Sequence, residues 1–137
     1  MHIIIPITYS ILFTLSALHV YWALGGTRGV NYAVPTMNGK PIFEPGRLIT
    51  LVVAVGLSFM GVLVILLHYQ GTSQYSWVLR PIGVVLGIVF GLRSIGDFNL
   101  IGLFKRVKDS TFAKYDTLAY TPLCVFLSAV FFVLSIA

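Results

Sequence analysis

The stretch RSIGDFNLIGLFKRVKDSTFAKYDTLAYTPLC, residues 93–124, decides how this chain folds. It follows a long apolar run and carries more than half of the charged residues of a chain that is only 9% charged. It then enters a second apolar run through Tyr120, Pro122 and Cys124. Polar sequence between two such runs is typical of a connection between membrane-spanning helices. We therefore interpret this stretch as one wall of a pocket or docking surface at the cytoplasmic face of a membrane.

The composition excludes several classes of protein. With 137 residues, 58% of them hydrophobic, the chain is too apolar for a typical soluble domain and long enough for one domain, residues 1–137. Its net charge of +5 favours contact with anionic lipid headgroups. The sequence lacks the basic face with interleaved aromatic residues that would predict nucleic-acid binding. A single cysteine excludes an internal disulfide and a metal site built from several cysteines.

Four apolar runs are long enough to cross a hydrocarbon core of about 30 Å as helices. They lie at about residues 3–24, 48–69, 78–95 and 117–137, with a short polar turn at 70–76. The last helix is expected to start near Asp116 and to bend mildly at Pro122. We predict an all-α fold, an antiparallel four-helix transmembrane bundle with two ordered cytoplasmic loops, 25–47 and 96–116.

The distribution of basic residues predicts the orientation. The side of the two long loops holds eight of the nine lysines and arginines, and the other side holds only Arg80. Because basic residues concentrate in cytoplasmic loops, both long loops are expected in the cytoplasm and both termini outside. The eight are Arg28, Lys40, Arg47, Arg93, Lys105, Arg106, Lys108 and Lys114.

Local patterns predict three further features. Asn38-Gly39 between short apolar segments is a hairpin-turn signal. Residues 99–109 place apolar side chains on one helical face and Lys105 and Arg106 opposite, which predicts a short interfacial helix whose basic face meets headgroups. Residues 109–111 are expected to cap the following helix. Glycines four residues apart form a stripe that favours close helix packing over a ligand groove: Gly83, Gly87 and Gly91.

Candidate site residues are judged against ordinary structural roles. Arg93 and Asp97 are four residues apart, so they form either a local ion pair or a pair in which Asp97 orients Arg93 toward an anion. Asp116 and Tyr120 share a helical stripe, and Asp116 could reach Lys114 or the basic face of residues 99–109. Glu44, the only glutamate, would serve as a salt-bridge partner or, less favourably, as an acid or base.

The histidines argue against a metal or haem site. His19 and His68 are expected about a membrane thickness apart, so they cannot ligate one centre. His2 could meet His68 outside the membrane. The sequence contains no HExxH, P-loop, GxSxG or CxxC motif, and we predict neither a metal site nor a cofactor.

The order of several motifs resembles a known family. HVYWALGG at 19–26 is followed by the AVP and NGKPIFEPG segments, then by RSIGDF, GLFKR and FAKYDTLAYTPLC. Across essentially the whole chain this resembles small bacterial four-span membrane proteins catalogued only as a domain of unknown function. The resemblance implies a location in the bacterial cytoplasmic membrane, and it implies no activity.

Three functional hypotheses follow, and enzymatic activity stays open in the first. The protein binds a small anionic or amphipathic ligand such as a lipid headgroup, it is an accessory subunit that docks a membrane or cytoplasmic partner, or it is an oligomeric transporter. The candidate ligand-binding residues are polar or aromatic and are expected at the cytoplasmic face: His19, Tyr21, Trp22, Glu44, Arg93, Asp97, Lys105, Arg106, Asp116 and Tyr120.

Overall fold

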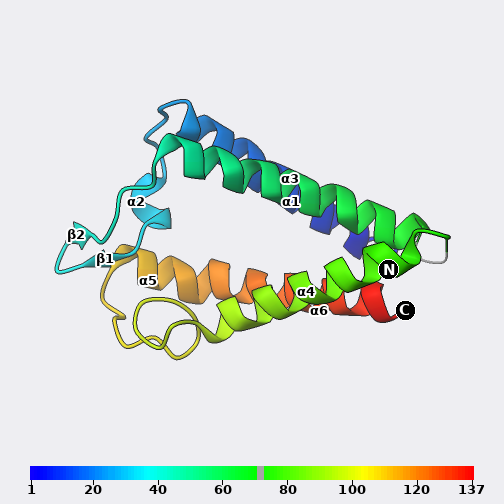
Figure 1. The fold of residues 1–137 in the computed structure, drawn as a ribbon. Coiled ribbons are helices and arrows are strands. Elements are labelled where there is room, and N and C mark those ends of the chain that lie inside the picture. Colours follow the sequence, from blue (N-terminus) through cyan, green and yellow to red (C-terminus); the bar gives the residue numbers. More distant parts are fainter. Residues whose placement is uncertain (71–72) are drawn as a thin grey trace. The chain divides into compact units, whose positions relative to one another are not determined.

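The computed structural model describes residues 1–70 and 73–137, so residues 71 and 72 of the predicted 70–76 turn lie outside the described residues (Figure 1). Its long helices are α1 (Ile4–Ala23), α3 (Arg47–Gln70), α4 (Ser76–Ile95) and α6 (Thr121–Ile136). Directly before α6 come α5 (Thr111–Tyr115) and the π-helix η1 (Asp116–Tyr120). The predicted all-α fold is confirmed, since residues 1–70 and 73–137 form four helices long and apolar enough to cross a membrane.

The segment between α1 and α3 contains a short helix and a hairpin. Helix α2 (Val30–Ala33) was not predicted, whereas the hairpin of β1 (Thr36–Met37) and β2 (Lys40–Pro41) was. Asn38 and Gly39 have φ angles of 53° and 76°. A two-residue turn of this type needs positive φ at both positions, which asparagine and glycine tolerate best, so the sequence signal is confirmed.

Two predictions for the second long connection are wrong. Residues 99–109 form no helix, because left-handed backbone at Gly96, Phe98 and Gly102 turns the chain instead. The final helical segment begins at Thr111 rather than near Asp116. Its N-cap is Ser110, whose side chain accepts a hydrogen bond of 3.0 Å from the backbone N–H of Ala113, as expected for a cap within 109–111.

The chain forms two compact units, residues 1–27, 45–85 and 131–137 in the first, and residues 28–44 and 86–130 in the second. In the first unit α1 packs antiparallel to α3. The Ser16 hydroxyl donates to the carbonyl of Ala54 at 2.6 Å, and the rings of His2 and His68 lie 6.3 Å apart at the other end of the pair.

The outward faces of these helices are apolar. In α3 the side chains of Leu48, Val52 and Val55 are 75%, 62% and 63% exposed. An apolar face of this extent is unfavourable in water and is typical of helices that contact lipid.

The small residues of α4 allow close approach to α6. A Cβ atom at Gly83 would lie 2.9 Å from Leu67 and would overlap Ser135 Oγ, both in the first unit. In the second unit, Ser128 Oγ donates a 2.7 Å hydrogen bond to the carbonyl of Gly87, and a Cβ at Gly91 would lie 3.2 Å from the same oxygen. This face of α4 therefore packs through its backbone.

Replacing Gly83 with leucine is expected to destabilise the fold by about 1–3 kcal/mol, because the added side chain has no room beside Ser135. Thermal unfolding in detergent measures the effect. Val85→Leu is the matched control, since Val85 is 58% exposed on the same helix. Equal transition temperatures for the two variants would contradict close packing at Gly83.

Candidate functional site

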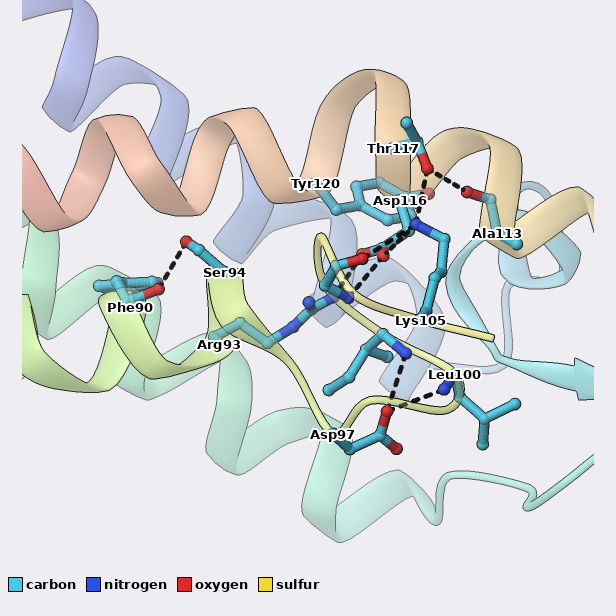
Figure 2. Close-up of polar contacts among 12 residues, drawn as sticks. Phe90, Arg93, Ser94, Asp97, Leu100, Lys105, Ala113, Asp116, Thr117 and Tyr120 are labelled. Carbon is cyan, nitrogen blue, oxygen red and sulfur yellow. Dashed lines mark hydrogen bonds and ion pairs between the residues drawn. The ribbon is translucent and has the colours of Figure 1, made fainter. Parts of the chain in front are cut away.

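Asp116 lies at the centre of a buried cluster of charges (Figure 2). Its side chain is fully buried. One carboxylate oxygen, Oδ1, accepts a hydrogen bond of 2.8 Å from Arg93 Nη2. The other, Oδ2, accepts from Lys105 Nζ at 3.1 Å and from the backbone N–H of Gly102 at 2.9 Å. Both oxygens are therefore occupied, and one carboxylate joins α4, the 96–110 connection and η1.

Lys105 is only 5% exposed, so the prediction that it faces lipid headgroups is wrong. Besides Asp116, its ammonium group donates to the carbonyl of Gly102 at 3.1 Å and to Thr117 Oγ1 at 2.6 Å. Thr117 Oγ1 in turn donates to the carbonyl of Ala113. An ammonium group has three protons, and here each has an acceptor. Burial of this charge is possible because its hydrogen bonds are complete.

Arg93 pairs with Asp116 and not with Asp97, which corrects the predicted i, i+4 pair. Only Nη2 of the guanidinium contacts the carboxylate. The second terminal nitrogen, Nη1, is buried and has no hydrogen-bond partner among the described residues. Together with Lys105, the three side chains carry a formal charge of +1. Arg93 is thus the incompletely satisfied member of the cluster.

Asp97 organises the backbone instead. Its Oδ1 accepts hydrogen bonds from the N–H groups of Asn99, Leu100 and Ile101 at 3.0, 2.8 and 3.1 Å. The bond from Leu100 contributes most to lowering the pKa of this carboxyl. Since the ionised form accepts the bonds, they stabilise the turn above the ordinary aspartate pKa of about 3.9, and this is lost as pH falls through the lower folded value.

The π-helix η1 places Asp116 and Tyr120 at its two ends. The N–H of Thr121 donates to the carbonyl of Asp116, five residues back. Pro122, which follows, has no N–H to continue the ordinary pattern. The Tyr120 hydroxyl donates to the carbonyl of Tyr32 at 2.8 Å and so connects η1 to α2. Single-turn π-helices occur frequently at functional sites.

The other predicted site residues lie elsewhere. His19, Tyr21 and Trp22 belong to the first unit, at the end of α1. His19 Nδ1 donates to the carbonyl of Leu15 at 2.7 Å, and its ring lies 5.0 Å from that of Trp22. Glu44 and Arg106 are exposed in the second unit. Of the ten candidates, Arg93 and Lys105 each contact Asp116, and inclusion of the others in one site stays a prediction.

The glycines after Trp22 explain part of the HVYWALGG motif. The N–H groups of Gly25 and Gly26 donate to the carbonyls of Trp22 and Tyr21, each at 3.0 Å. Gly25 has a φ of 104°. This is the hydrogen-bond pattern of a glycine-terminated helix. The motif therefore ends α1.

Sequence reasoning missed Gly102 and Thr117 as members of the Asp116 cluster. A buried aspartate needs backbone and hydroxyl partners as well as cations, so the glycine of GLFKR and the threonine after Asp116 were the available signals. His2 and His68 do meet, as the sequence allowed. The described residues contain no group of three or more histidine, cysteine, aspartate or glutamate side chains able to hold a metal ion.

Comparison with known proteins places the chain in a family. A family model described as "Protein of unknown function (DUF3995)" matches residues 12–131, which include the whole Asp116 cluster. No curated protein and no solved structure matches the chain.

Proposed function

The chain belongs to the DUF3995 family, whose description assigns no activity, and from the site itself we propose that it is a membrane protein that binds a small anionic group at Arg93. The observation that carries this proposal is the buried Arg93 Nη1, which lacks a partner among the described residues. Leaving a buried cationic donor unpaired is costly, so an anionic oxygen at this position would be favourable.

The chemistry of the cluster favours a phosphate or carboxylate group. Each proton of the Lys105 ammonium has an acceptor, and both oxygens of the Asp116 carboxylate accept hydrogen bonds, so neither group requires a further partner. Arg93 is 28% exposed through its side chain, and the N–H groups in the plane of a guanidinium suit hydrogen bonds to oxyanions. At the end of a helix able to span a membrane, an abundant source of such a group is a lipid headgroup.

The proposed orientation follows the basic residues. The connections that contain residues 25–47 and 96–116 lie in the cytoplasm of a bacterial cell, and both termini lie on the other side of its cytoplasmic membrane. Eight of nine lysines and arginines then lie on the cytoplasmic side, which supports this arrangement. The Arg93 site would bind headgroups of the inner leaflet, where anionic lipids attract basic residues.

Arg93→Lys is expected to weaken binding of an anionic lipid about 10-fold or more, because it keeps one charge for Asp116 and removes the second guanidinium nitrogen. The measurement is the rise in thermal transition temperature on adding short-chain phosphatidylglycerol to protein in a neutral detergent. Phosphatidylcholine, added in the same amounts, reports nonspecific stabilisation.

Arg47→Lys is the matched control, since Arg47 is exposed and lies outside the cluster. It should respond to phosphatidylglycerol like the unmodified protein. A wild-type protein that responds equally to both lipids, or an Arg93→Lys variant that keeps the full response, would refute the proposal.

An accessory role is the second candidate. Met37, Ile42 and Phe43, in and beside the hairpin, are 42%, 45% and 54% exposed. Apolar side chains exposed on this long connection favour contact with a partner protein.

A further inference from the structure

Residues 96–104 form a closed loop, which we call the 96–104 loop. The N–H of Leu103 donates to the carbonyl of Ser94 at 2.9 Å. Gly96 and Gly102 cross at its base so closely that a Cβ at either would overlap backbone atoms of the other side. Their φ angles are 86° and 88°, which glycine adopts freely. The two ends of the loop are therefore in direct backbone contact.

The backbone donors of the loop are satisfied within the protein. The N–H groups of residues 99–101 donate to Asp97, that of Gly102 to Asp116 and that of Leu103 to Ser94. Five consecutive amides thus have acceptors without water. Irregular backbone is tolerated near hydrocarbon only when its polar groups are satisfied in this way.

The side chains of the loop have the opposite character. Phe98, Leu103 and Phe104 are 56%, 61% and 60% exposed, and the two phenylalanine rings lie 6.1 Å apart. Phe98 has a φ of 63°, a conformation that is rare for a bulky residue. Arg106 and Lys108, just beyond the loop, are also exposed. These three side chains, which we call the apolar patch of the loop, thus lie close in the sequence to two basic residues.

The position of the loop in the chain indicates which surroundings this apolar patch contacts. It leaves α4 at Ile95, and the next helix able to span a membrane begins at Thr111. A connection this short between two spans must lie at the membrane surface. Apolar and aromatic side chains favour the boundary between headgroups and acyl chains there, and basic ones favour anionic headgroups.

We propose that the 96–104 loop inserts Phe98, Leu103 and Phe104 into the interfacial zone of an anionic lipid bilayer, with Arg106 and Lys108 among the headgroups. The proposal goes beyond the binding of an anion at Arg93, because none of these side chains belongs to the Asp116 cluster. It assigns an interaction surface whose partner is the bilayer itself.

Site-directed spin labelling tests the insertion in the full chain. Cys124 is replaced by alanine, and nitroxide labels are attached to Phe104→Cys or Asp109→Cys in vesicles of phosphatidylcholine and phosphatidylglycerol. Asp109 is the control because it is exposed on the same connection. The ratio of collision with oxygen to collision with a water-soluble nickel chelate is expected to be several-fold higher at position 104.

Equal ratios at positions 104 and 109 would overturn the proposal and show that the apolar patch lies in water or against a protein. A label at Leu103→Cys repeats the measurement if Phe104→Cys does not fold. The Arg93→Lys variant should retain the high ratio at position 104. If the wild-type protein shows no preference for phosphatidylglycerol but position 104 is inserted, only the Arg93 proposal fails. If the preference is present but position 104 is not inserted, only the insertion proposal fails.

Discussion

Replacing Asp116 with alanine is expected to destabilise the protein by about 3–5 kcal/mol, the cost of leaving buried charges without their partner. The substitution removes the counter-ion of Arg93 and Lys105 at once. It also removes the acceptor for the backbone N–H of Gly102. Denaturant or thermal unfolding in detergent, followed by circular dichroism, measures the loss.

A double-mutant cycle identifies the partner of Arg93. Arg93→Ala and Asp116→Ala should be strongly non-additive, because the two side chains are in contact at 2.8 Å. Arg93→Ala and Asp97→Ala should be additive, because Asp97 bonds to backbone amides instead. Coupling of Arg93 to Asp97, with none to Asp116, would refute the structure of the cluster.

Replacing Gly96 with alanine is expected to open the 96–104 loop. An alanine there meets two penalties, a φ of 86° and overlap with the carbonyl of Ile101. The left-handed backbone alone costs about 1–2 kcal/mol, and the overlap with backbone cannot be relieved by moving a side chain. Hydrogen exchange followed by mass spectrometry should show faster exchange of the amides of residues 99–103.

Gly39→Ala separates the two penalties. Gly39 has a φ of 76°, yet among the described residues other than its two chain neighbours no atom lies within 4 Å of a Cβ built on it. This variant therefore meets only the backbone cost, and its effect should be smaller and confined to the hairpin. If both variants change stability equally, the close crossing of Gly96 and Gly102 does not contribute.

The parts of the fold set by local sequence were predictable. Long apolar runs predicted the four long helices, because length and hydrophobicity are properties of each segment alone. Asn38-Gly39 predicted the hairpin, since positive φ at both positions is a local preference. Ser110 fell within the three residues predicted to cap the last helix.

The sequence allowed contact of Asp116 with the basic residues of 99–109, and Lys105 makes that contact. The partner of Arg93 depended on the path of the chain and was not predictable. Spacing favoured Asp97 as the partner of Arg93, but the backbone N–H groups of residues 99–101 occupy Asp97. The chain then turns at Gly102, which brings Lys105 to Asp116. The apolar spacing of residues 99–109 matched that of an amphipathic helix, and spacing alone does not reveal the left-handed turns at Gly96, Phe98 and Gly102.

The two oxygens of Asp116 bind different parts of the protein, so this carboxylate connects Arg93 to the 96–104 loop. Oδ1 holds Arg93, while Oδ2 holds the loop through Gly102 and Lys105. The anion proposed to bind at Nη1 would contact the same guanidinium that pairs with Oδ1. By thermodynamic reciprocity, if that anion changes the stability of the inserted loop by some factor, insertion of the loop changes the affinity for the anion by the same factor. The proposed headgroup site and the proposed membrane contact of the loop therefore share one carboxylate.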